Sequence, residues 1–146
     1  MPKQFVFLDS SVIFSATKSK LGGSFRILEE CRAGTFQAVI SKRVIREVQI
    51  NLQEKHPELL SVFYNFLFEV GFQITNPTIT LIKKCQEIIN PDDAVILAAA
   101  LKAKVDCLIT LDKKHFMDMN VTKKAPIVIL TPRDFLSQMR SKGVIN

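Results

Sequence analysis

The chain has 146 residues, a length that suits one domain, and 47% of them are hydrophobic against 23% charged. This composition excludes a disordered, collagen-like or low-complexity protein. Twenty Lys and Arg residues against 14 Asp and Glu residues leave a net charge of +6, which favours a polyanionic partner such as nucleic acid.

The cysteines and histidines indicate the cellular compartment and exclude some kinds of metal site. Cys31, Cys85 and Cys107 are odd in number and include no CxxC pair, which argues against a disulfide framework or a cysteine zinc site and favours a reducing cytosol. His56 and His115 are the only histidines, so a three-histidine site is excluded. The N-terminus lacks a signal peptide, and no apolar run approaches the ~20 residues of a membrane span. We therefore expect a soluble, cytoplasmic protein with no membrane segment.

Short apolar runs that each end at a polar residue predict buried, parallel strands. Four such runs cover residues 5–8, 36–40, 105–110 and 127–130, and a weaker one covers 72–74. Segments with helical spacing separate these runs. We predict an α/β fold in a single three-layer domain, with a central parallel sheet of four or five strands flanked by helices. The domain covers residues 1–141, and residues 142–146 form a short tail.

Three of the predicted helices have clear start signals. Ser41 can cap a helix that carries apolar residues along one side. Asn90 and Thr131 each precede a proline, which suits the first helical position, and acidic residues follow in the first turn.

A strongly apolar segment begins at Leu59 and ends at Gly71. Most of its apolar side chains fall on one broad helical face, but Tyr64 and Phe68 lie on the flank of that face. The segment is either a helix deep in the core or a helix whose flank forms a subunit interface. The pattern leaves both interpretations open.

Four acidic residues are placed where the predicted strands end and the helices begin. Asp9 ends the first strand, and Asp112 lies just past the strand that ends at Thr110. Asp93 is in the first turn of one helix, and Glu47 is about two turns into another, beside its apolar side. Because ligands of an open parallel sheet bind at this edge, we expect the four carboxylates to converge in one crevice.

Converging carboxylates predict a metal site. They repel one another and their pKa values rise unless a cation lies between them. Mg²⁺ and Mn²⁺ prefer oxygen ligands, lower the pKa of bound water and stabilise the charge of a phosphodiester displacement. Together with the basic surface, this chemistry predicts hydrolysis of a nucleic acid.

Each acid also has a purely structural explanation. Asp9 can cap the following helix, Asp93 can complement a helix dipole, and Asp112 can fix a turn. Glu47 can pair with Arg43, one helical turn earlier. The shared placement of the four acids favours the metal site over four separate structural roles.

Basic residues flank the proposed acids. Arg43, Arg46, Lys113 and Lys114 are either contacts for an RNA backbone or solvated surface charges. His115, three positions past the last acid, either contacts a phosphate or packs in its loop, and we favour packing.

Four segments, in order and with suitable spacing, resemble motifs of the PIN-domain family of metal-dependent nucleases. They are FVFLDSSVIF (5–14), SKRVIREVQINL (41–52), NPDDAVILAAALKAKVDCLITLD (90–112) and TPRDFL (131–136). The first three are similar to the segments that carry the family's four acids. The last is similar to the closing motif of a VapC-like branch described as toxins of toxin–antitoxin pairs. The resemblance covers nearly the whole chain.

The resemblance implies RNA hydrolysis with Mg²⁺ or Mn²⁺ in a sheet-and-helix fold. The implied metal-binding residues are Asp9, Glu47, Asp93 and Asp112. The implied accessory residues are Ser10 and Thr110, which would orient ligands and waters, and Asp92. The implied partners are RNA, an antitoxin protein and a second copy of the chain, with the helix from Leu59 to Gly71 as the expected dimer contact.

Two other functions compete with a metal-dependent endoribonuclease. One is a non-catalytic RNA- or protein-binding module that keeps the acidic pocket. The other is a phosphoacceptor signalling domain, which needs a pair of acids at the first strand and an acceptor aspartate at a middle strand. Asp9 stands alone at its strand end and no middle strand supplies an aspartate, so this reading ranks last.

Overall fold

The computed structural model describes residues 2–146 and places its strands in one sheet. The strands are β1 (Gln4–Leu8), β2 (Phe36–Ile40), β3 (Gln73–Ile74), β4 (Cys107–Ile109) and β5 (Val128–Leu130). Their order is β3-β2-β1-β4-β5, and every neighbouring pair is parallel. This sheet confirms the predicted α/β fold, and the weaker run at 72–74 supplies the edge strand β3.

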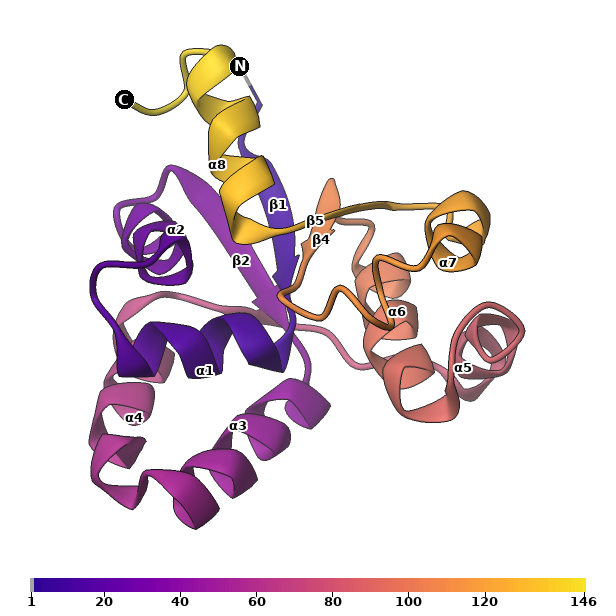
Figure 1. The fold of residues 1–146 in the computed structure, drawn as a ribbon, viewed down its shortest axis with the longest axis horizontal. Coiled ribbons are helices and arrows are strands. Elements are labelled where there is room, and N and C mark those ends of the chain that lie inside the picture. Colours follow the sequence, from indigo (N-terminus) through magenta and orange to yellow (C-terminus); the bar gives the residue numbers. More distant parts are fainter. Residues whose placement is uncertain (1) are drawn as a thin grey trace.

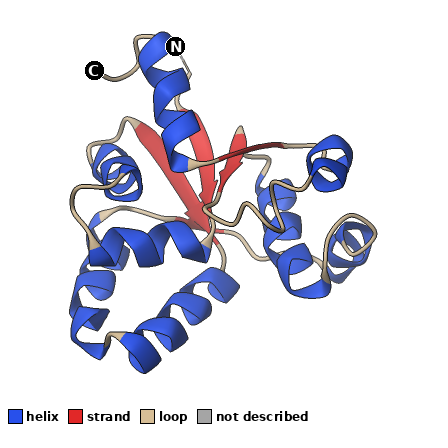
Figure 2. Cartoon of the chain, viewed as in Figure 1, coloured by secondary structure: helices blue, strands red, loops and turns tan. Residues whose placement is uncertain are grey.

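Helices lie to either side of the strands (Figure 2). They are α1 (Ser10–Lys18), α2 (Gly23–Arg32), α3 (Lys42–Lys55), the short 3₁₀ helix η1 (Pro57–Leu59), α4 (Leu60–Glu69), α5 (Ile79–Cys85), α6 (Pro91–Ala103), α7 (Met119–Lys124) and α8 (Pro132–Ser141). In Figure 1, α1 to α4 lie to one side of the strands and α5 to α7 to the other. After α8, Val144 and Ile145 of the tail pack, partly buried, against the core.

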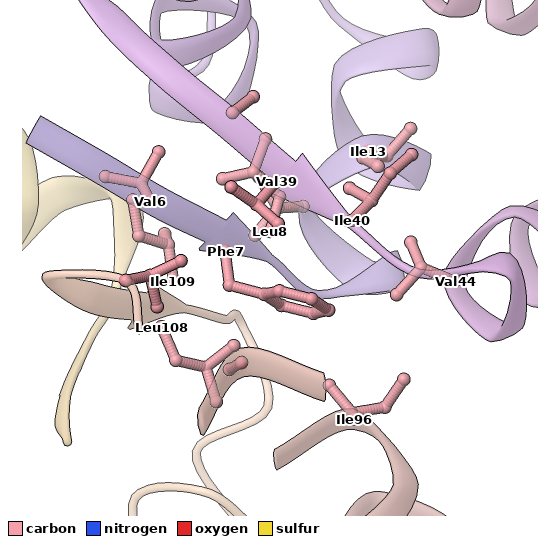
Figure 3. Close-up of a cluster of buried hydrophobic side chains, with 14 of the residues drawn as sticks. Val6, Phe7, Leu8, Ile13, Val39, Ile40, Val44, Ile96, Leu108 and Ile109 are labelled. Carbon is pink, nitrogen blue, oxygen red and sulfur yellow. The ribbon is translucent and has the colours of Figure 1, made fainter. Parts of the chain in front are cut away.

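The central strand β1 is buried on both faces. Val6, Phe7 and Leu8 have no exposed surface. Because successive strand residues point to opposite faces, Phe7 extends toward Ile96 of α6 while Val6 and Leu8 point the other way (Figure 3). A strand covered on both sides requires a continuous apolar run, which is the pattern that predicted it.

Helix α4 combines the two interpretations of the apolar segment. Phe63 is fully buried, whereas 47% of Tyr64 and 91% of Phe68 is exposed. One side of α4 therefore belongs to the core, and its flank is open on this chain.

The strand order changes direction between β1 and β4. The chain starts in the centre at β1, extends outward through β2 and β3, and then crosses back to β4 and β5 on the other side. The carboxyl ends of β1 and β4 meet there, and the backbone N–H of Asp9 donates to the carbonyl of Ile109 at 3.0 Å. Open α/β sheets bind their ligands at such a change of direction.

Two expectations about the chain's environment can be compared with the structure. Cys31, Cys85 and Cys107 are all buried and free. Within residues 2–146, no helix combines the length and the hydropathy that crossing a membrane requires.

Candidate active site

Asp9 joins the end of β1 to the start of α1 and is buried, with 6% of its surface exposed. Its Oδ1 accepts a hydrogen bond from the backbone N–H of Ser10 at 2.8 Å, which caps α1. Its Oδ2 accepts from Ser11 Oγ at 2.9 Å and from Thr110 Oγ1 at 2.8 Å. Asp9 therefore caps α1 with one oxygen atom and accepts from two hydroxyl groups with the other.

Burial is the main influence on the Asp9 carboxyl and raises its pKa above the ordinary value. The hydrogen bonds from Thr110, Ser11 and Ser10 partly lower this pKa, and the nearby charge of Asp93 raises it. Across residues 2–146, no Lys, Arg or His side chain forms an ion pair with Asp9. Its negative charge is thus held by neutral donors alone.

Glu47 lies in the second turn of α3, which Ser41 caps. Burial raises the pKa of Glu47, the side chain of Ser10 lowers it, and the charge of Asp9 raises it again. Arg43 also lowers this pKa, since its Nε lies 3.6 Å from Glu47 Oε2. Glu47 therefore pairs with Arg43 on α3 and at the same time lies near enough to Asp9 to be affected by its charge.

Asp93 is oriented by the residue that caps its helix. Asn90 Oδ1 accepts from the Asp93 backbone N–H at 3.0 Å, and Asn90 Nδ2 donates to Asp93 Oδ2 at 2.6 Å. Burial raises the pKa of Asp93, Asn90 lowers it, the charge of Asp112 raises it, and His115 lowers it. The side chain thus faces the loop after β4.

Asp112 is held in that loop by three contacts. Its backbone N–H donates to Thr110 Oγ1 at 3.0 Å, and its Oδ1 accepts from the His115 backbone N–H at 3.0 Å. Its Oδ2 lies 2.9 Å from His115 Nδ1, which is also 3.9 Å from Asp93 Oδ2. One atom each of Asp93, Asp112 and His115 lies within 4.8 Å of the others, a spacing that a single metal ion could bridge.

The structure brings the four predicted acids to one edge of the sheet. A carboxylate oxygen of Asp93 lies within 4.8 Å of one of Asp112. The charges of Asp9 and Asp93 raise the pKa of Glu47, and the charge of Asp93 raises the pKa of Asp9. Asp92 differs, because 87% of its side chain is exposed and its Oδ1 lies 3.4 Å from Arg43 Nη2. It contacts a basic residue at the rim rather than the other acids.

The basic candidates line three grooves, of which one also includes an acid of the site, Glu47. Arg43 and Arg46 line a groove of about 380 Å³ beside Glu47. Lys114 lines one of about 350 Å³ beside Asn90 and His115, and Lys113 lines one of about 490 Å³ at the start of α8. A polyanion passing over the acids would meet positive charge on each of these sides.

Sequence reasoning missed three contributors to the site. Ser11 was not considered, although it is the second of two hydroxyl residues after Asp9. Asn90 was treated as a helix cap only, whereas its amide also donates to a carboxylate. His115 was expected to pack in its loop; its ring contacts Asp112 of that loop and also lies 3.9 Å from Asp93 Oδ2, outside it. Its spacing of three from Asp112 is the signal that could have indicated this.

The donor set fits a hard divalent cation. Carboxylate oxygens predominate, and burial together with mutual repulsion disfavours the ionised form of Asp9, Glu47 and Asp93. A cation relieves both effects. The fold and the site together define an α/β protein with a cluster of acidic residues at the switch point of a parallel sheet.

The sequence profile of the PIN domain matches residues 5–114, which is most of the chain. The chain therefore belongs to the PIN-domain family, whose members are generally nucleases that use divalent metals. The matched region includes all four acids. None of the curated proteins compared with the chain matches it significantly in sequence.

Solved structures share the fold at low sequence identity. One is VapBC2 from Rickettsia felis, whose crystal structure holds a DNA fragment from the promoter of its genes. It aligns with a TM-score of 0.66 at 16% identity, over 87% of this chain and 98% of that one. PAE2754 from Pyrobaculum aerophilum gives 0.63 at 12% identity over 95% and 90% of the two chains. FitAcB from Neisseria gonorrhoeae gives 0.60 at 14% identity over 88% and 98%. The chain therefore has the fold of these proteins over almost its entire length.

Proposed function

We propose that this protein is a metal-dependent endoribonuclease that hydrolyses RNA phosphodiester bonds, with Asp9, Glu47, Asp93 and Asp112 holding Mg²⁺ or Mn²⁺. One observation carries the proposal: carboxyls from four separate segments meet at one edge of the sheet, and burial raises the pKa of three of them. Such an arrangement costs free energy without a cation. Membership of a nuclease family and the net charge of +6 support a nucleic-acid substrate.

The chain's own residues would divide the work. When bound, the ion supplies an acidified water and neutralises charge on the scissile phosphate. Thr110 holds Asp9 and the Asp112 loop in a common position, since its hydroxyl bonds both. Asn90 aims Asp93, and Ser10 lies beside Glu47. Arg46, Lys113 and Lys114 would bind flanking phosphates, whereas Arg43 also neutralises Glu47.

The biological setting proposed is a type II toxin–antitoxin pair in the cytoplasm, with this chain as the toxin. The resemblance of residues 131–136 to the closing motif of a toxin branch supports it, as does the shared fold with VapBC2 and FitAcB. The three free cysteines suit a reducing compartment. A homodimer through the exposed flank of α4 is part of this proposal.

Cleavage of a labelled single-stranded RNA tests the enzyme directly. Wild type, Asp93→Asn and Asp134→Asn are compared with Mn²⁺ and with EDTA. Asp134 is the matched control, because it also follows a cap and a proline in the first turn of a helix, and its backbone N–H donates to Thr131 Oγ1. Wild type and Asp134→Asn are expected to cleave with Mn²⁺ only, and Asp93→Asn to lose at least about 100-fold in rate.

Contamination and misassignment give different results in this design. A contaminating ribonuclease would cleave equally in all three samples and would ignore EDTA. Tight RNA binding by wild type without Mn²⁺-dependent cleavage would refute the enzyme and favour the non-catalytic binding module.

A further inference from the structure

His115 stands apart from the other residues at the acidic edge because it offers a nitrogen donor. Its ring Nδ1 lies 2.9 Å from Asp112 Oδ2 and 3.9 Å from Asp93 Oδ2, and its side chain is about half exposed. The other histidine, His56, lies elsewhere, with its Nδ1 3.4 Å from Glu58 Oε1. None of the four-acid chemistry proposed above uses an imidazole.

We propose that His115 binds the metal ion through Nδ1, together with Asp93 and Asp112, and that this makes the site prefer a first-row transition ion to Mg²⁺. The proposal rests on the metal site of the proposed function and adds a ligand and a selectivity to it. Mg²⁺ keeps oxygen ligands and water. Imidazole nitrogen bonds more strongly to first-row transition ions, and Mn²⁺, although it also favours oxygen, accepts such a nitrogen more readily than Mg²⁺ does.

The loop after β4 holds the ring in this position. Asp112 Oδ1 accepts the His115 backbone N–H, so the turn fixes the side chains of both residues on the same side. The other oxygen of Asp112 is then left beside Nδ1. Asn90 Nδ2 donates to Asp93 Oδ2 at 2.6 Å and fixes that carboxyl. One donor atom each of Asp93, Asp112 and His115 therefore lies within 4.8 Å of the others before any ion binds.

A different role for His115 predicts an effect of opposite sign. If the ring is only an imidazolium that neutralises Asp93 and Asp112, it competes with a metal ion, and its removal strengthens metal binding. If it is a ligand, its removal weakens binding of a transition ion and has little effect on Mg²⁺. Metal affinity therefore separates a counter-ion from a ligand.

Mn²⁺ binding to the full chain, without RNA, tests the proposal. Calorimetry compares wild type, His115→Gln and His56→Gln, the last as a control because His56 is also partly exposed and pairs with an acid. His115→Gln is expected to weaken Mn²⁺ binding by about tenfold or more and to change Mg²⁺ binding by less than about twofold. His56→Gln is expected to match wild type for both ions.

Electron paramagnetic resonance of bound Mn²⁺ detects nitrogen coordination directly and does not require the protein to be active. Wild type is expected to show electron spin-echo modulation from a coordinated ¹⁴N nucleus, replaced by a ¹⁵N pattern after labelling with ¹⁵N-histidine. His115→Gln is expected to lose this modulation and His56→Gln to keep it. Mn²⁺ bound without nitrogen coupling, or bound more tightly by His115→Gln, overturns the proposal while leaving the nuclease intact. Absence of any Mn²⁺ binding by wild type instead contradicts the metal site of the proposed function itself.

Discussion

Thr110 connects two of the acids through one hydroxyl group. Its Oγ1 donates to Asp9 Oδ2 and accepts from the backbone N–H of Asp112, and the residue has no exposed surface. A buried hydroxyl that satisfies two partners costs more to remove than one that faces water. Sequence reasoning marked Thr110 as an orienting residue, and the structure shows which groups it contacts.

Thr110→Val keeps the shape of the side chain and removes both hydrogen bonds. We expect the free energy of unfolding in EDTA to fall by about 1–3 kcal/mol, because Asp9 loses a donor and the Asp112 N–H loses its acceptor. The matched change Thr122→Val, at an exposed hydroxyl that donates to the Met119 carbonyl, is expected to cost no more than about 0.5 kcal/mol. Urea titration of both variants measures this, and equal losses would show that the Thr110 bridge has no special value.

At the scale of elements, helix starts were the best predicted feature. Ser41, Asn90 and Thr131 each accept a hydrogen bond from the backbone N–H three residues later, as their sequence signals predict. These signals are local, since a cap and the amide it satisfies lie within one turn. The sequence did not predict which side chains of α4 are buried, because an aromatic residue on the flank of a helix is buried or exposed according to what packs beside it.

Helix α4 allows the dimer proposal to be separated from core packing. Phe68→Ser, on the exposed flank, is expected to convert a dimer to a monomer in sedimentation equilibrium and to change the monomer's free energy of unfolding by less than about 0.5 kcal/mol. Phe63→Ala, on the buried face, is expected to cost about 3–5 kcal/mol. If wild type and Phe68→Ser have the same mass at all concentrations, α4 is not the interface.

At the scale of the whole molecule, burial of the acidic residues makes the stability of the metal-free fold depend on pH. A carboxyl whose pKa is raised on folding ionises first in the unfolded chain. Below the ordinary pKa of about 4, both states hold the proton. As pH rises, the metal-free fold loses stability until the pH passes the raised pKa.

Asp93→Asn removes one of these carboxyls and tests the linkage. In EDTA, the stability of Asp93→Asn relative to wild type is expected to increase as pH rises from about 4 to 7, because burial raises the pKa of Asp93 in the folded state. With Mn²⁺ at pH 7, wild type is expected to be more stable than Asp93→Asn, because the ion binds folded wild type more tightly and so stabilises it more. Urea midpoints at both pH values measure the effect. A difference that does not depend on pH would show that Asp93 titrates alike in the folded and unfolded chains.

The sequence by itself determined the α/β class, the positions of the strands, the starts of three helices and the four candidate acids. Apolar runs, helix caps and acids at strand ends are properties of short segments, so they can be recognised without the fold. The tertiary structure decided how Thr110 reaches Asp9 across 101 residues of sequence, which side of α4 is buried, and that the ring of His115 lies 3.9 Å from Asp93. These features depend on contacts between segments that only the folded sheet brings together, and no local pattern encodes the distance between them.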